Sequence, residues 1–158
     1  MSRKQRFLVV CSAHARGESL KNTKILEGDL QRIYRQHFGS DTSITLIWNV
    51  IPEGQAFIAG APSTATTVLT PVPDHAGQDL RERFMRDICT SWQGRTGCSI
   101  NEIIVTAMNV TEAKRYAQMS RRRFDPRKGK SLAVKVGVGM LHSRATKGYL
   151  SNTLNMPS

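Results

Sequence analysis

The chain has 158 residues, with 23 Lys and Arg against 12 Asp and Glu, so its formal net charge is +11 at pH 7. This length is enough for one domain with a hydrophobic core, and we expect residues 1–158 to form a single domain. A hydrophobic content of 39% argues against a disordered chain, and no apolar run reaches the roughly 20 residues of a membrane-spanning helix, so we expect no membrane partner.

The first apolar segment of the chain follows a short basic stretch. Residues 3–6 read Arg-Lys-Gln-Arg, and residues 7–13 read Phe-Leu-Val-Val-Cys-Ser-Ala. A signal peptide starts with a similar pattern, but this apolar run is short and is followed by His14 and Arg16. We therefore predict a first β-strand beginning near residue 7, preceded by an N-terminal arm of residues 1–6.

Two segments carry apolar residues at steps of three and four, which predicts helices with one buried face. The first has Leu20, Leu26, Leu30, Ile33 and Tyr34, and the second has Leu80, Phe84, Met85, Ile88, Cys89 and Trp92. A β-prone run follows each of them, at residues 44–48 and 103–108. These runs predict the strands to which the helices return.

The order of these signals repeats at an offset of roughly 60 residues, with Gly17 falling on Gly77. We predict two β-α-β units, residues 7–65 and 66–120. Together they give an α/β fold in which a four-stranded sheet carries two helices on one face. Because the other face of the sheet stays uncovered, we expect the chain to self-associate.

The positive charge is concentrated at the C-terminal end. Residues 1–113 hold 12 Lys and Arg against 11 Asp and Glu, whereas residues 114–158 hold 11 against one. Such a segment suits nucleic acid, an anionic ligand, an acidic neighbouring subunit or a solvated tail. Within it, residues 132–140 alternate between apolar and other residues, which predicts a half-buried strand. We expect the basic extension, residues 121–158, to wrap a neighbouring subunit.

The three cysteines, Cys11, Cys89 and Cys98, form no Cys-x-x-Cys pair and cannot all be bridged. This argues against a disulfide scaffold or a zinc module, and it favours a reducing, cytoplasmic compartment. The four histidines are too scattered in the sequence to indicate a metal site. We expect neither a metal nor another cofactor.

Residues 48–60, Trp-Asn-Val-Ile-Pro-Glu-Gly-Gln-Ala-Phe-Ile-Ala-Gly, combine a strand, a proline-containing turn, an aromatic residue and a glycine-rich segment. This stretch and the β-α-β order over residues 7–120 resemble the tautomerase superfamily, in particular the group around cis-3-chloroacrylic acid dehalogenase. The resemblance implies a homotrimer with small pockets near the strand starts. In that family such pockets hold unsaturated or keto carboxylic acids.

The chemistry of that family depends on an amino-terminal proline, which this sequence replaces. Residue 2 is Ser, and the family's proline position falls at about Phe7, with no proline between Met1 and Phe7. The α-amine of Ser2 lies on an arm that offers no evident way to hold it in a pocket. We therefore expect no dehalogenation by the family's route.

The resemblance also places other family positions on this chain. The histidine of the first helix falls on Tyr34, and the aromatic donor of the last core strand falls near Thr106. The arginine pair falls near Pro73 and Ala76, with His75 between them. The catalytic glutamate falls near Ala117.

We predict substitutes for these groups from their chemistry. Tyr34, His75 and Thr106 are the candidate catalytic residues, because their side chains can give or accept hydrogen bonds or protons. Candidate substrate-binding residues are Arg6, Phe7, Arg81 and Arg115. The guanidinium groups of the three arginines suit a carboxylate, and Phe7 stands at the family's proline position. The alternatives are a core tyrosine, an exposed histidine and surface arginines without a ligand.

Three hypotheses of function follow. The first is an isomerase or lyase of the tautomerase fold that acts on a small anionic substrate without a terminal proline. The second is a non-catalytic trimer that binds an anionic metabolite. The third is a nucleic-acid-binding protein that uses residues 114–147. The whole basic tail, residues 114–158, has only Tyr116, Phe124 and Tyr149 to stack on bases, so binding would be mainly electrostatic.

Overall fold

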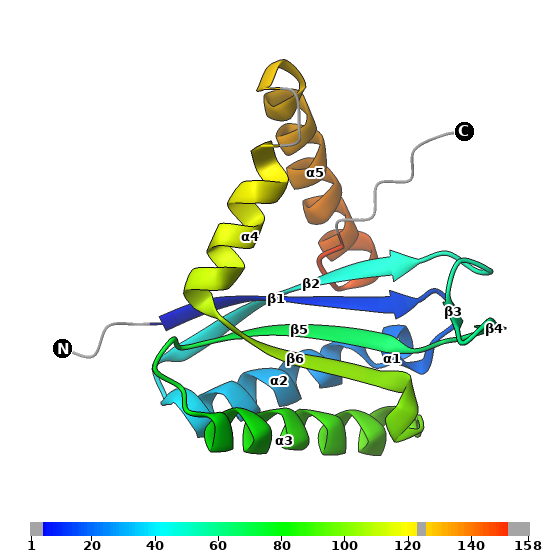
Figure 1. Cartoon of the computed structure of the whole chain (residues 1–158). Helices are drawn as coiled ribbons and strands as arrows, with labels where there is room; N and C mark the ends of the chain where they lie inside the picture. Colours follow the sequence, from blue (N-terminus) through cyan, green and yellow to red (C-terminus); the bar gives the residue numbers. More distant parts are fainter. Residues whose placement is uncertain (1–4, 123–125, 152–158) are drawn as a thin grey trace.

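The computed structural model describes the backbone of residues 5–122 and 126–151, and the side chains of residues 5–119 and 131–151. Strands and helices alternate along most of this length (Figure 1). The elements are β1 (Gln5–His14), α1 (Glu18–Lys21), α2 (Thr23–Phe38), β2 (Thr42–Ile51), β3 (Phe57–Ile58), β4 (Ala61–Pro62), β5 (Thr66–Val72), α3 (Gln78–Thr96), a 3-10 turn (Ile100–Glu102), β6 (Ile103–Asn109), α4 (Val110–Arg122) and α5 (Pro126–Lys147).

Four strands form one sheet in the order β2-β1-β5-β6. The pairs β1 with β2 and β5 with β6 are parallel, and each is joined through a crossover helix. Antiparallel pairing of β1 with β5 joins the two units, with Val10 opposite Leu69 and Ser12 opposite Thr67. Helices α2 and α3 lie side by side on one face of the sheet (Figure 1). The predicted pair of β-α-β units with two helices on one face is confirmed.

The core lies between this sheet and the two helices. Every second residue of β1, from Phe7 to Ala13, is buried toward the helices, as the period of a strand requires. Of the apolar positions predicted for the helices, Leu26, Leu30, Ile33 and Tyr34 of α2 and Phe84, Ile88 and Trp92 of α3 are buried. The others, Leu20, Leu80, Met85 and Cys89, are partly buried against the same core. The 3- and 4-residue steps in the sequence therefore identified the buried faces correctly.

The opposite face of the sheet carries apolar side chains that water reaches. Leu8 is 52% exposed, Leu69 is 38% exposed and Ile104 is 51% exposed. Each alternates along its strand with residues that point into the core. We call the surface defined by Leu8, Leu69 and Ile104 the open face.

Residues 132–140 form part of a helix, so the predicted strand is wrong. The helix α5 begins at Pro126, which suits the first position of a helix, and Gly148 (φ 79°) follows its last residue and donates its N–H to the carbonyl of Arg144 at 3.1 Å. An alternating run of small apolar residues is compatible with either structure when it lies between such helix boundaries. The boundary residues, and not the alternation, were the informative signal.

The helices α4 and α5 form a hairpin on the side of the sheet opposite α2 and α3 (Figure 1). We call this hairpin, residues 110–147, the helical arm. After it the chain returns to the edge of the sheet, where the N–H of Trp48 donates to the carbonyl of Leu150 at 2.8 Å. The ring of Tyr149 packs against Trp48, with 6.2 Å between centroids. None of the helices in the described residues is long and apolar enough to cross a bilayer.

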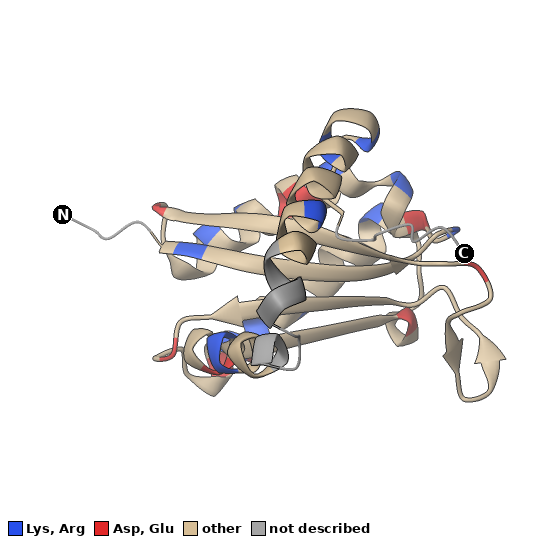
Figure 2. Cartoon of the chain, turned by 90° about the horizontal axis from the view of Figure 1, so that it is seen from above, with Lys and Arg blue, Asp and Glu red and all other residues tan. Residues whose placement is uncertain are grey.

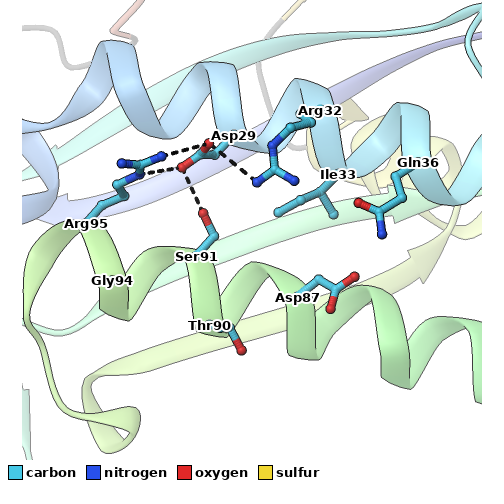
Figure 3. Close-up of a pocket in the computed structure, with 9 residues that line it drawn as sticks. All are labelled: Asp29, Arg32, Ile33, Gln36, Asp87, Thr90, Ser91, Gly94 and Arg95. Atoms are coloured by element: carbon cyan, nitrogen blue, oxygen red, sulfur yellow. Dashed lines mark hydrogen bonds and ion pairs between the residues drawn. The ribbon is translucent and has the colours of Figure 1, made fainter.

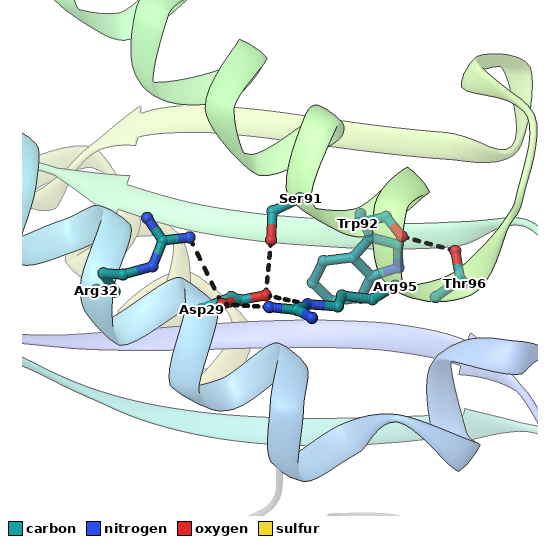
Figure 4. A network of polar contacts seen from close by, with 6 residues as sticks. All are labelled: Asp29, Arg32, Ser91, Trp92, Arg95 and Thr96. Atoms are coloured by element: carbon teal, nitrogen blue, oxygen red, sulfur yellow. Dashed lines mark hydrogen bonds and ion pairs between the residues drawn. The ribbon is translucent and has the colours of Figure 1, made fainter.

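A network of polar contacts around Asp29 holds α2 to α3 (Figure 4). The Asp29 side chain is only 13% exposed. Its carboxylate accepts hydrogen bonds from Arg95 Nε at 2.7 Å and from Ser91 Oγ at 2.9 Å, and it forms an ion pair with Arg32 at 3.5 Å. The hydrogen bond from Arg95, followed by that from Ser91 and the charges of Arg95 and Arg32, holds the pKa of Asp29 below its usual value.

Replacing this carboxylate is expected to destabilise the fold. We expect Asp29→Asn to lower the free energy of unfolding at pH 7 by about 1–2 kcal/mol, because charge-assisted hydrogen bonds become neutral ones. The depressed pKa means that the carboxylate stabilises the fold above its unfolded-state pKa, about 4, and that this contribution is lost as the pH falls through the folded-state pKa. Urea unfolding should therefore show the difference between variant and wild type at pH 7 and a smaller one at about pH 3.

The matched control is Asp41→Asn, since Asp41 is exposed and forms no ion pair with the described residues. It should unfold like the wild type at both pH values. An equal loss of stability in both variants would contradict the role given to Asp29.

Candidate functional site

A groove of about 440 Å³ lies at the end of the sheet where β1 begins. Three segments that are distant in the sequence form it: the start of β1, the loop after β5 and the first turns of α4. Figure 1 shows this end of the sheet, where α4 leaves β6. The lining residues are Gln5, Arg6, Phe7, Pro73, Asp74, His75, Val110 and Lys114.

The loop after β5 is fastened to the beginning of α4. The Asp74 carboxylate accepts a hydrogen bond from the N–H of Thr111 at 3.0 Å and another from the Thr111 hydroxyl. It thereby caps a helix that belongs to a different part of the chain. These two hydrogen bonds, and then the charges of Lys114 and Arg81, hold the pKa of Asp74 below its usual value. The carboxylate of Asp74, the negatively charged group of the groove, is thus already hydrogen-bonded to the first turn of α4.

The other charged groups of the groove are positive. Arg6 projects from β1 and Lys114 from α4, and both side chains belong to exposed residues. His75 lies between these elements on the loop and is also exposed. The amino end of α4, a helix of 13 residues, adds partial positive charge from its N–H groups. The arrangement suits a small anion, and the imidazole of His75 can give or take a proton beside it.

Three of the seven predicted site residues line this groove, namely Arg6, Phe7 and His75. Phe7 is 5% exposed, so only a small part of its ring is accessible from the groove. Behind it the ring contacts Tyr34, with 5.3 Å between centroids. Phe7 therefore forms an apolar floor beneath the charged groups.

Tyr34 is a core residue and does not line the groove. It is fully buried among Phe7, Phe38 and Phe84, and its hydroxyl donates to the carbonyl of Pro71 at 2.8 Å. Burial raises the pKa of the phenol. The structure therefore favours the alternative stated for Tyr34, that of a core tyrosine.

Arg81 connects α3 to the end of β6. Its guanidinium donates to the carbonyl of Ala76 at 2.9 Å and to that of Ala107 at 2.8 Å, and it also bonds the side chain of Asn109. These acceptors belong to the loop before α3 and to the strand that precedes α4. The guanidinium thus holds the two segments that carry Asp74 and Thr111.

The remaining predicted residues lie apart from the groove. Arg115 is exposed on α4, and Thr106 lies on β6. The carbonyl of Thr106 accepts a hydrogen bond from Thr70, whereas its buried hydroxyl oxygen has no partner among the described residues. Ser2 and residues 123–125 lie outside the described residues.

Sequence reasoning missed Lys114 and Asp74 as members of the site. In the sequence Lys114 is one of many cations of the basic segment, and its place in the groove depends on the path of β6. One signal was present: Thr111 lies at the start of a helix that directly follows a strand, and an acidic side chain is favourable at such a start. The sequence did not show that Asp74, 37 positions earlier, would supply it.

A second hollow, also of about 440 Å³, lies between α2 and α3 (Figure 3). Its charged groups are paired with one another or with neighbours: Asp29 with Arg32 and Arg95, and Asp87 with His37 at 2.7 Å. The pairs Asp29–Arg95 and Asp87–His37 join the two helices, whereas Asp29–Arg32 lies within α2. Little charge is left for a ligand. In the described parts of the chain no three His, Cys, Asp or Glu side chains are placed to hold a metal ion.

No protein-family model and no curated protein matches the sequence. Solved structures match the fold. One is a fused 4-OT symmetric trimer, with a TM-score of 0.58 and 12% identity over 65% of this chain and 85% of that one. Another is Pt0534 inactivated by 2-oxo-3-pentynoate, with a TM-score of 0.57 and 17% identity over 65% of this chain and 84% of that one. N1, a member of the cis-3-chloroacrylic acid dehalogenase family, matches with a TM-score of 0.59 and 11% identity, over 65% of this chain and 74% of its own.

These structures belong to the tautomerase superfamily, so the resemblance stated from residues 7–120 is confirmed at the level of fold. About a third of this chain has no counterpart in them. The chain has the tandem β-α-β fold of the tautomerase superfamily, shared with a member of the cis-3-chloroacrylic acid dehalogenase family.

Proposed function

We propose that this protein is an isomerase or lyase that acts on a small keto or unsaturated carboxylic acid without an amino-terminal proline. The observation that carries the proposal is the groove in which Arg6, His75 and Lys114 meet from three separate segments. The fold supports the general class, because the matched structures belong to an enzyme superfamily. One of them is inactivated by 2-oxo-3-pentynoate, which is a keto carboxylic acid.

In the proposed reaction, the two cationic side chains hold the substrate and His75 moves the proton. Arg6 and Lys114 bind the carboxylate and stabilise the negative charge that develops on the enol oxygen. The imidazole of His75 takes the proton from the enol hydroxyl, and the imidazolium so formed delivers a proton to the neighbouring carbon and is neutral again. One O–H bond breaks and one C–H bond forms, so the product is the keto acid. Phe7 supplies an apolar surface beneath the reacting carbons.

Removal of the imidazole tests the catalytic part of the proposal. With phenylenolpyruvate or a 2-hydroxydienoate as substrate, we expect His75→Ala to lower kcat by about 100-fold or more with little change in KM, because the proton carrier is lost while the cations remain. The decay of the enol absorbance gives the rate. His142→Ala, which removes an exposed histidine of α5, is the control and should keep wild-type turnover.

Removal of a groove cation tests the binding part. We expect Lys114→Ala and Arg6→Ala each to raise KM, or the Kd of a non-reacting keto acid, by roughly tenfold, since each loses a charge-assisted contact worth about 1.4 kcal/mol. Lys24→Ala is the control, because Lys24 is exposed on α2 and does not line the groove. If Lys24→Ala weakened binding as much as the groove variants, the groove would not be the anion site. The same conclusion would follow if neither groove variant changed the affinity.

A second candidate function is anion binding without turnover. It is favoured by one observation: of the three residues predicted to be catalytic, only His75 lines the groove. Saturable binding of a keto acid that depends on Arg6 and Lys114, without any acceleration of tautomerisation over buffer, would support this candidate.

The proposal includes self-association. The matched fused 4-OT is a trimer, and the open face of this chain exposes Leu8, Leu69 and Ile104 to water. Burying such apolar surface between copies is favourable. We therefore propose a homotrimer in which the open face is covered by other copies.

A charge placed on the open face should disrupt this assembly. We expect Ile104→Lys to shift the protein from trimer toward monomer in sedimentation equilibrium, because burying an unpaired ammonium group is costly. Ile100→Lys is the control: Ile100 is 54% exposed, close to the 51% of Ile104, but lies in the 3-10 turn and not on the open face. Trimers that survive Ile104→Lys would contradict the proposed interface.

A further inference from the structure

The helical arm exposes a second set of apolar side chains, separate from the open face. On α4 these are Tyr116 and Met119, and on α5 they are Val134, Val138 and Leu141, which are 66%, 62% and 71% exposed. The spacings of three, four and three residues place each set along one side of its helix. Each helix of the arm therefore presents an uncovered apolar stripe.

The middle of α5 has the composition of a buried helix. Residues 131–143 contain one charged residue, Lys135, and their apolar residues are spread around the helix without a polar face. They also contain Gly137, Gly139 and three valines, all of which have low helix propensity. Because propensity does not stabilise this helix, its stability has to come from packing.

Among the described residues, the polar contacts that tie α5 to the rest of the chain lie near its end. There the Ser143 hydroxyl donates to the carbonyl of Tyr149 at 2.9 Å, and Arg144 pairs with Glu27 at 3.3 Å. Val134 and Val138, farther from the sheet, remain exposed. Within the described residues the middle of α5 therefore has an apolar stripe without a covering element.

The position of the arm brings this stripe to the surface that we assign to self-association. The arm leaves the sheet after β6, at one edge, and the chain returns to it at β2, the opposite edge. Between these points it lies over the same side of the sheet as the open face (Figures 1 and 2). A second copy that approaches the open face therefore meets the arm as well.

We propose that the stripe of Val134, Val138 and Leu141 packs against the open face of a second copy of this chain. This inference rests on the proposed self-association and adds the element that makes the contact. The residues that define the two surfaces are all apolar, so their contact removes apolar area from water. Packing of two arms along each other would instead bring like charges together, because the described side chains of each arm include five cations, Lys114, Arg115, Lys135, Arg144 and Lys147, against Glu112.

Photo-crosslinking in the full chain tests the contact directly. The variant Leu141→p-benzoylphenylalanine, irradiated as a mixture of ¹⁵N-labelled and unlabelled protein, should give a covalent dimer containing one chain of each kind. Mass spectrometry should locate the second attachment on peptides of β1, β5 or β6. Ile100→p-benzoylphenylalanine is the control, since Ile100 is exposed but lies outside the arm and the open face. It should give no such dimer.

The strength of the contact is tested by Leu141→Glu against His142→Glu, two adjacent exposed positions of α5 that receive the same side chain. We expect the dissociation constant of the assembly to rise at least tenfold for Leu141→Glu and to stay within twofold of wild type for His142→Glu, at unchanged far-UV circular dichroism.

The outcomes separate this inference from the proposed trimer. A wild-type trimer without a mixed cross-link, or one insensitive to Leu141→Glu, would overturn the arm contact and leave the trimer in place. A monomeric wild type would overturn both. A monomer that binds vesicles of anionic phospholipid, and loses that binding in Leu141→Glu, would overturn the contact and assign the stripe to a lipid surface.

Discussion

The antiparallel pairing of β1 with β5 determines which segments of the chain meet at the groove. Each β-α-β unit on its own has two parallel strands, whose starts lie at one end and whose carboxyl ends lie at the other. Because β1 runs opposite to β5 and β6, the start of β1 lies beside the ends of those two strands. Arg6, the loop that carries His75 and the helix that carries Lys114 meet for this reason. The groove is a consequence of strand direction.

The secondary structure of the two units could be predicted because their local patterns and their burial agree. Trp92 and Ile88 of α3 are buried where a period of 3.6 residues places them, and Phe7 and Val9 are buried where a period of two places them. Residues 132–140 show where pattern fails, since small apolar residues between Pro126 and Gly148 satisfy both periods. There the boundaries of the segment decided its structure.

The candidate site was only partly predictable, for a related reason. Arg6 and His75 line the groove, and both are residues to which the resemblance points: Arg6 stands beside the displaced strand start, and His75 lies between the positions of the family's arginine pair. Lys114 and Asp74 join the site through contacts between segments that no local pattern encodes. The guanidinium of Arg81 suits a carboxylate, which is why the sequence predicts that it binds substrate. In the structure it donates hydrogen bonds to three acceptors of the chain itself. Residue type predicted the chemistry of each side chain and not its partner.

The return of the chain to β2 also limits how this protein can associate. The edge of a sheet offers free N–H and C=O groups, and a strand from another molecule can pair with them and extend the sheet without limit. At Trp48 this position is taken, because its N–H bonds the carbonyl of Leu150 and its backbone forms a bridge with Ser151. Leu150 and Ser151 therefore occupy the edge of β2 at Trp48. They disfavour open-ended growth of the sheet from β2, whereas β6 remains the other edge strand of the described sheet.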